Sequence, residues 1–224
     1  MIKILHMYFD LLNLYGENAN VRALVKSLEN HGQKVRVDFK SIEDNIKIND
    51  YDFIYLGSGL DEAIELVKKD LKKYKKDLKK YINDNKYILV TGNAIDALED
   101  ILNYKVKKID FRIVGEQVFT FNGLDKLVIG FQNRNSVIYD IKEDSLFEVY
   151  KGCGYDPSSK NEGIRKNNLY ATYLLGPILV RNPYLLEYFI KNLLESKNIK
   201  YTKIKKDVSY VAYEEYLKNF VYDK

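Results

Sequence analysis

The sequence predicts an α/β fold, a three-layer sandwich in which a mostly parallel central sheet carries an antiparallel β extension. Apolar strand-like runs alternate with segments of helical periodicity through the first hundred residues, and parallel neighbouring strands need such crossover helices. After about Ile109, short β-rich runs follow one another with Gly, Asn and Asp turns between them, which is typical of antiparallel strands. Because no repeat or linker interrupts the chain, we expect one domain, residues 1–224.

The first half alternates strands with helices. Tyr51–Gly57 is a near-continuous apolar run, as found in a parallel strand that is covered on both faces. Between Ile64 and Tyr81 the apolar residues step by three or four, which places them on one stripe of a helix while the lysines face water. By the same reasoning we expect strands at 2–7, 34–39 and 86–90, and a helix from about residue 21 to a stop near Gly32.

The second half is richer in β-structure. We expect antiparallel strands within 112–121, 126–133, 136–141 and 145–152, and a last buried strand within 168–176. Asn182 and Pro183 predict a helix start, with the asparagine as its cap and the proline at its first position. The tail, Asp207 to Tyr222, predicts an amphipathic helix rich in tyrosine.

Composition excludes several classes of protein. No run approaches the roughly 18 apolar residues of a membrane span, and we expect no signal peptide. The single cysteine, Cys153, allows no internal disulfide and, with only His6 and His31, no soft-ligand metal cluster. The net charge of +4 sits largely on a lysine-rich helix face, which favours a solvated surface over a nucleic-acid patch. We expect a cytoplasmic protein without a cofactor.

An open α/β sheet binds ligands at the carboxyl ends of its strands. Three segments follow apolar strands: Gly57-Ser58-Gly59, Thr91-Gly92-Asn93 and Leu175-Gly176-Pro177. The first offers backbone N–H groups that larger side chains would shield, which suits a carboxylate or an oxyanion. Since glycines also form ordinary strand-to-helix turns, a purely structural role stays open.

Five stretches carry a resemblance to a known family. They are LHMYFDLLNLYGENANVRAL, YLGSGLDE, RIVGE, GFQNRNS and NEGIRKNNLYATYLLGPILVRNP. Taken together and in this order, they resemble the class I glutamine amidotransferase family of cobyric acid synthase type. Within that family they are most similar to the GatD branch, the subunits of lipid II isoglutaminyl synthase. The resemblance runs over nearly the whole chain, with a shortening around residues 102–110.

This resemblance implies a fold in which a cysteine at a strand-to-helix elbow attacks glutamine and a histidine activates it. The ammonia then passes to a Mur-ligase-like partner protein. The family's Cys-Gly-Gly elbow aligns with Thr91, Gly92 and Asn93, and the family's histidine aligns with Leu175. We therefore expect no intact catalytic residue.

The double replacement removes the chemistry of the pair. A thiolate acts through its low pKa and its nucleophilicity, which an imidazole partner supports. Leucine accepts no proton, and an aliphatic hydroxyl is far less acidic than a thiol. Cys153 lies in the loop KGCGY, where the family has no nucleophile, and we interpret it as an incidental thiol.

Other family positions are retained. Arg112 aligns with an arginine that binds substrate, and a guanidinium fork suits a carboxylate, although a surface arginine at a strand start is the alternative. Asn133 is kept from a Glu-Asn-His motif and is first a turn residue, second a ligand contact. His6 aligns with a family histidine and is expected to be hydrogen-bonded and partly buried. The expected substrate-binding residues, for glutamine or a small carboxylate, are Gly57, Ser58, Gly59, Gly92, Arg112 and Asn133.

Three hypotheses follow. The first is a catalytically inactive amidotransferase-like subunit that binds or regulates a Mur-ligase-like synthetase, in cell-wall precursor amidation or in a corrin-type amidation. The second is an active enzyme that uses Thr91 as nucleophile or takes a base from a partner, and it requires a titratable group within reach of the Thr91 hydroxyl. The third is a sensor of an amino acid or a small carboxylate.

Overall fold

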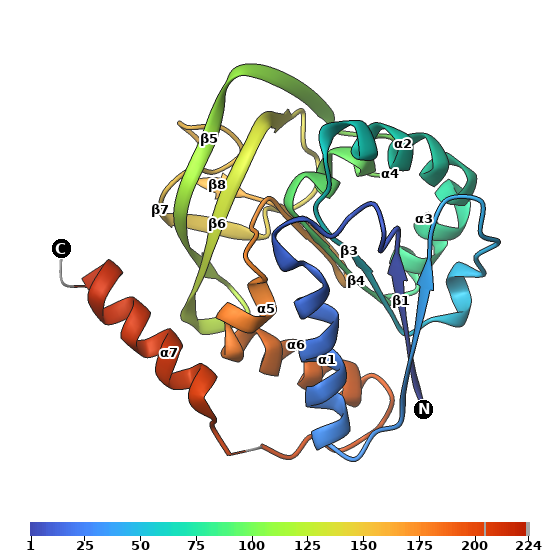
Figure 1. The fold of residues 1–224 in the computed structure, drawn as a ribbon, viewed down its shortest axis with the longest axis vertical. Helices are drawn as coiled ribbons and strands as arrows, with labels where there is room; N and C mark the ends of the chain where they lie inside the picture. Colours follow the sequence, from blue (N-terminus) through green and yellow to red (C-terminus); the bar gives the residue numbers. More distant parts are fainter. Residues whose placement is uncertain (204, 223–224) are drawn as a thin grey trace.

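The computed structural model describes residues 1–203 and 205–222, which form two β-sheets with helices packed around the larger one (Figure 1). The larger sheet has the strand order β2-β1-β3-β4-β10-β9, and its neighbours are parallel except for β9, which runs antiparallel to β10. The smaller sheet, β6-β5-β7-β8, is antiparallel. The predicted α/β class is therefore confirmed.

The bounds of the elements are as follows. The strands are β1 Ile2–Met7, β2 Val35–Lys40, β3 Phe53–Leu56, β4 Tyr87–Thr91, β5 Lys105–Phe121, β6 Leu124–Tyr139, β7 Phe147–Lys151, β8 Asn161–Glu162, β9 Ile164–Lys166 and β10 Leu169–Thr172. The helices are α1 Asn18–Asn30, α2 Asp61–Leu71, α3 Lys75–Asn83, α4 Glu99–Leu102, α5 Ile178–Arg181, α6 Pro183–Glu195 and α7 Val208–Leu217.

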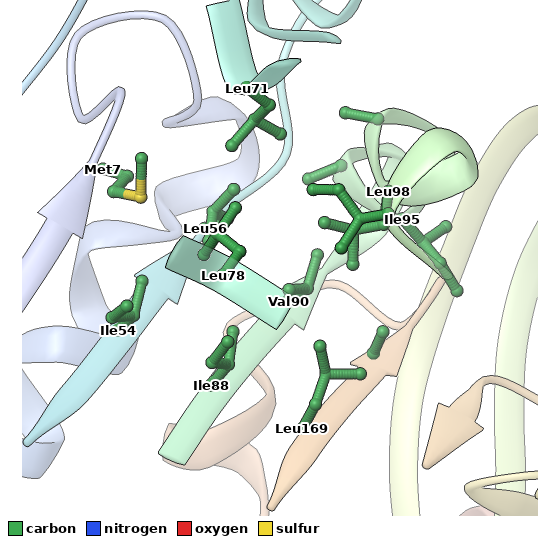
Figure 2. Close-up of a cluster of buried hydrophobic side chains, with 14 of the residues drawn as sticks. Met7, Ile54, Leu56, Leu71, Leu78, Ile88, Val90, Ile95, Leu98 and Leu169 are labelled. Atoms are coloured by element: carbon green, nitrogen blue, oxygen red, sulfur yellow. The ribbon is translucent and has the colours of Figure 1, made fainter. Parts of the chain in front are cut away.

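The central sheet separates two apolar layers, because alternate residues of its buried strands point to opposite faces. One layer lies between the sheet and α2, α3 and α4. Figure 2 shows part of it, with Ile54 and Leu56 of β3 and Ile88 and Val90 of β4 facing helix side chains such as Leu78. The other layer packs α1, α5 and α6 against the opposite face. This is the predicted three-layer arrangement.

The second sheet differs from the expected series of short strands. β5 and β6 form one long antiparallel ribbon, with an irregularity between Lys108 and Ile113. The expected break between residues 133 and 136 is absent. Asn133 and Asn135, which look like turn residues in the sequence, both lie within β6, and Asn133 is paired with Val114 of β5. Their side chains bond Tyr15 and Asp61.

The helices differ from expectation in two places and agree with it in a third. The predicted helix from Ile64 to Tyr81 is divided into α2 and α3 by a 3₁₀ turn at Lys72–Tyr74, and its apolar stripe is retained. The segment after β4 begins as 3₁₀ turns, Gly92–Leu98, before α4. Pro183 is the first residue of α6 as predicted.

The predicted cap of α6 is wrong in its mechanism. The Asn182 side chain makes no capping bond. It bonds instead to both the N–H and the carbonyl of Ile129 in β6, at 2.8 and 2.7 Å. This asparagine therefore joins the helix layer to the ribbon.

The tail forms α7 and a π-helical turn, Lys218–Tyr222. Asp207 caps α7 by accepting a hydrogen bond from the Ser209 N–H. Tyr213 and Leu217 pack against Val118 and Ile129 of the ribbon. Among the described residues, no helix is both long and apolar enough to cross a membrane.

Candidate functional site

The candidate site lies where β3, β4 and β10 end side by side. Thr172 is paired with Thr91, so the two strand ends are level. Beyond them, the Gly92 N–H donates to the Leu174 carbonyl at 3.1 Å, and Leu175 and Phe131 of β6 exchange two backbone bonds of 2.8 and 3.3 Å. The segment after β10 is therefore held both to the turn after β4 and to the ribbon.

Gly92 forms the apex of this turn, with a φ of +62° that side chains rarely adopt. A Cβ at this position would collide with Leu175 Cδ2 and would come within 2.6 Å of Ser58 Cβ and 2.7 Å of Ser58 Oγ. Leu175 and Ser58 therefore fill the space above the turn, and no side chain projects from its apex.

Thr91 lies below this apex. Its backbone is extended, with φ −124° and ψ 151°, and its side chain is fully buried. The Thr91 hydroxyl bonds the Glu17 carboxyl and lies 2.8 Å from the Tyr55 hydroxyl. The residue that the alignment places at the nucleophile position thus points into the protein.

Glu17 is the main residue of the site that sequence reasoning missed. It is fully buried, and desolvation raises the pKa of its carboxyl to about 7, although hydrogen bonds from Thr91, Tyr55 and the Gly176 N–H act against this rise. Its second oxygen, Oε1, has no hydrogen-bond partner in the described part of the chain. The only signal in the sequence is an acid that follows Gly16 directly after the first strand and its loop.

Asn20 extends this network to the helix layer. Its amide donates to the Tyr55 hydroxyl at 2.8 Å, and its carbonyl oxygen accepts from the Leu179 N–H at 2.8 Å. The first turns of α1 are therefore tied to β3 and to α5. The network fixes the strand ends beneath the turn.

The glycine–serine–glycine turn is closed on the protein itself. A Cβ on Gly57 would come within 2.5 Å of the Leu12 carbonyl oxygen, and one on Gly59 within 2.7 Å of the Leu11 carbonyl oxygen, so close packing requires both glycines. The Asn93 side chain accepts from Ser58 Oγ at 2.9 Å and from the Gly59 N–H at 3.1 Å, and donates to the Gly59 carbonyl at 2.8 Å. The backbone donor expected to meet a ligand is thus occupied by Asn93.

Arg112 and Asn133 form a separate, exposed cluster. The Arg112 guanidinium donates two hydrogen bonds to the Asn133 side-chain oxygen, at 2.9 and 2.7 Å. The Asn133 amide donates to the Tyr15 hydroxyl at 2.8 Å. The predicted substrate arginine is therefore paired with the predicted asparagine, and no carboxylate is bonded to it within the described residues.

A second buried acid, Glu162, lies beside the end of β10. It accepts hydrogen bonds of 2.8 Å from the Thr172 hydroxyl and the Tyr173 N–H, and burial raises its pKa to about 7. The Arg134 guanidinium lies 4.0 Å from the centre of the Tyr173 ring. Arg134 also donates to the carbonyls of Ser136, Gly154 and Tyr155, which fixes the loop that contains Cys153.

The remaining predicted residues take no part in the closed turn. Cys153 is half-buried, and its N–H donates to Gln117. His6 is fully buried rather than partly buried, both ring nitrogens lack a partner in the described residues, and burial lowers its pKa to about 4. The expectation of a hydrogen-bonded His6 is therefore wrong, because aromatic rings surround it: Phe9, Phe39 and Tyr55. No cluster of metal-binding side chains occurs in the described ranges.

Comparison with solved structures supports the fold. The chain is similar to PurLQS from Thermotoga maritima, with a TM-score of 0.61 and 11% identity over 88% of this chain and 99% of the other. It is also similar to a glutamine amidotransferase from the same organism, with a TM-score of 0.55 and 13% identity over 96% and 89% of the two chains. At these identities, the likeness concerns the fold alone.

Comparison with curated proteins is more specific. The chain is 26% identical to the GatD subunit of the glutamine-hydrolysing lipid II isoglutaminyl synthase of Streptococcus pneumoniae, over 96% of this chain and 87% of the relative. It is 30% identical to the GatD subunit of the same synthase in Staphylococcus aureus, over 88% and 86%. No family model matches the chain. On the extent and level of these two matches, the chain belongs to the GatD family of glutamine amidotransferase-like proteins.

Proposed function

We propose that this chain is a GatD-type subunit without glutaminase activity, which binds a Mur-ligase-like synthetase in the amidation of a cell-wall precursor. The curated relatives, both subunits of lipid II isoglutaminyl synthase, favour this pathway over a corrin-type amidation. In this proposal residues 1–224 act as one domain, since the two sheets are joined through Phe131 and Leu175. The proposal also places this domain in the cytoplasm.

The turn at Gly92, closed by the side chains of Leu175 and Ser58, is the observation that carries the proposal. By its backbone geometry, we assign the position of the family's nucleophile to Gly92 rather than to Thr91, because a nucleophile elbow presents its side chain from a sharp turn after a strand. Gly92 has no side chain, and Leu175 and Ser58 occupy the space into which one would project. Of these two residues, Leu175 offers no titratable group and Ser58 only a hydroxyl that donates to Asn93, so no thiol or base of the described residues is seen in that space.

The loss of activity is tested by measuring ammonia release from glutamine, with the Staphylococcus aureus relative as the positive control. We expect the purified chain to show no release above the uncatalysed background, alone or with its synthetase. Turnover by the wild-type chain that a Ser58→Ala or Leu175→Ala substitution alters would refute the proposal.

The partner role is tested by co-purifying the chain with a Mur-ligase-like protein from the same organism. If the complex forms, its synthetase should amidate the precursor with ammonium chloride and not with glutamine. A complex that uses glutamine would contradict inactivity, and failure of every such protein to co-purify would contradict the partner role.

A second candidate function has one specific observation in its favour. The Thr91 hydroxyl contacts Glu17, a titratable group whose pKa is raised to about 7, as a general base for a threonine nucleophile would require. Against it, both side chains are fully buried, and the Tyr55 hydroxyl also donates to the carboxyl. A substrate carbonyl has no path to this hydroxyl.

Replacement of Thr91 separates the two candidates. If Thr91 is the nucleophile, Thr91→Ser retains ammonia release and Thr91→Ala abolishes it. If the first proposal holds, neither variant changes a rate that is already at background. Both variants should be checked by thermal unfolding, because the hydroxyl belongs to a buried network.

A further inference from the structure

A hollow of about 240 Å³ lies between α1, α6 and the chain that enters α7. Figure 1 shows where these segments run. It shares no residue with the closed turn. Its apolar lining comes from the two helices and the segment before α6, and includes Ala23, Leu179, Pro183 and Leu186. A cavity of roughly 150 Å³ holds a benzene molecule, so this one has room for a single ring or a short branched chain.

The acidic groups of this lining are already engaged. Glu187 accepts a hydrogen bond on each oxygen, from Tyr201 at 2.5 Å and from Tyr210 at 3.3 Å. Asp207 accepts from the N–H and the hydroxyl of Ser209 as the cap of α7. Both carboxylates are therefore supplied with donors from the protein.

The basic groups of the lining are not engaged in the same way. Lys26 and Lys205 are exposed lining residues. Within the described residues, neither ammonium has a hydrogen bond or a carboxylate at ion-pair distance. The charge of Lys26 lowers the pKa of Asp207 from a longer distance. His31 stacks on Tyr201 with ring centres 5.1 Å apart, and its Nε2 atom is buried without a partner in the same residues. The unused hydrogen-bonding capacity thus lies mainly in two cations.

We propose that this hollow binds a small organic acid, with one aromatic ring or a short branched chain against the apolar lining and its carboxylate between Lys26 and Lys205. Apolar burial supplies the attraction for the body of the ligand, and the two ammoniums select for the anion. This site is independent of the proposed function, because it uses none of the residues of the strand-end turns.

The test is a ¹⁹F NMR titration with 4-(trifluoromethyl)phenylacetate, compared with the neutral 4-(trifluoromethyl)benzyl alcohol. We expect saturable binding of one acid per chain and at least about tenfold weaker binding of the alcohol. Equal binding of the two probes would overturn the role of the lysines. Absence of saturable binding would overturn the site.

Two sets of variants locate the binding. The double substitution Lys26→Glu with Lys205→Glu should weaken binding of the acid at least about tenfold. Lys69→Glu with Lys76→Glu makes the same charge change on the exposed face of α2 and α3 and should leave the affinity unchanged.

Leu186→Trp and Ala23→Phe each fill the hollow from a different helix, so loss of binding in either variant that keeps the wild-type melting temperature supports the site. Wild-type affinity in a folded filling variant, or an equal loss in both charge variants, contradicts it.

Discussion

At the scale of single residues, three side chains fill the space and use the hydrogen-bonding groups of the strand-end site. Leu175 fills the space above Gly92, and Asn93 takes the donor that Gly59 would offer. The third is Glu17, whose carboxyl joins Thr91 and Tyr55 below the turn. Most polar groups of the site therefore bond one another, and Glu17 Oε1 is left without a partner in the described residues.

The buried carboxyl of Glu17 makes stability depend on pH. Its pKa rises from 4.5 to about 7 on folding, so the folded state holds a proton that the unfolded state has lost between these values, and stability falls as pH rises through this window. Replacement by Gln removes the titration. The stability of Glu17→Gln relative to wild type should therefore increase by about 3 kcal/mol between pH 4.5 and 7.5.

Urea unfolding of both proteins across this range measures the difference. His6, whose pKa is lowered to about 4, acts in the opposite direction below pH 6.5, and Glu162 acts in the same direction as Glu17. Both are present in the two proteins and cancel in the comparison. Parallel stability curves would show that Glu17 titrates normally.

Gly92 and Leu175 should be energetically coupled. Gly92→Ala introduces left-handed strain and a collision, for a cost of about 2–4 kcal/mol, and Leu175→Ala costs about 2–5 kcal/mol through the cavity it leaves. The double variant should cost at least about 1 kcal/mol less than the sum, because removal of the Leu175 side chain relieves the closest of the collisions, although the contact with Ser58 remains.

Gly32→Ala is the matched control for this cycle. Gly32 has a φ of +74°, similar to that of Gly92, but no atom lies within 4 Å of the added Cβ. It therefore carries the strain without the collision, and its effect should add to that of Leu175→Ala. Additivity at Gly92 as well would mean that Leu175 does not fill the turn.

At the scale of elements, the loop after β7 depends on the ribbon through Arg134. This buried guanidinium donates to two carbonyls of the loop, those of Gly154 and Tyr155, and to the Ser136 carbonyl in β6. The loop has few apolar contacts of its own, since Cys153 and Tyr155 are only partly buried. Arg134 is therefore a main support of the segment between β7 and β8, beside the bond from the Cys153 N–H to Gln117.

Arg134→Met should release this loop. The substitution leaves three carbonyls without their donor and should cost about 3 kcal/mol or more. Hydrogen exchange should become faster at the amides of Cys153 and Tyr155. Arg165→Met serves as control: its guanidinium lies over Phe121 and Tyr170, at 5.6 and 5.5 Å from the ring centres, so its removal should cost about 1 kcal/mol and leave the loop amides unchanged.

The elements also show what could be predicted from the sequence. β1, β3 and β4 follow from apolar runs, because burial on both faces leaves a direct trace in composition. The length of β6 could not be predicted, because the asparagines that interrupt the pattern are satisfied by Tyr15 and Asp61 from distant parts of the chain. That Thr91 and Leu175 stand where the family has its cysteine and histidine stays a prediction from the resemblance. Glu17 and the role of Asn93 required the tertiary structure, because their partners lie far away in the sequence.

At the scale of the whole molecule, the two sheets meet at the candidate site. The backbone pair between Phe131 and Leu175 connects the ribbon to the end of β10. Asn182 makes a second connection, from the helix layer to Ile129. Leu175, which fills the space above Gly92, is therefore also part of the junction between the sheets.

Because Leu175 is held in this junction and fills the space above Gly92, we expect that glutamine does not stabilise the protein. A ligand present at 100 times its Kd adds about 2.7 kcal/mol to the folded state, which is several degrees in melting temperature. We expect no shift with 10 mM glutamine or isoglutamine, measured by differential scanning fluorimetry. A saturable shift with either compound would favour the sensor hypothesis.

The filled turn also bears on how the chain can change over generations. A cysteine introduced at Gly92 would collide with Leu175, and a histidine introduced at Leu175 would face a glycine, which has no thiol or hydroxyl to activate. Asn93 would still hold the Gly59 N–H after both changes. Under the proposed function, each of these changes on its own brings a cost or no benefit, so single substitutions would not bring glutamine hydrolysis to this turn.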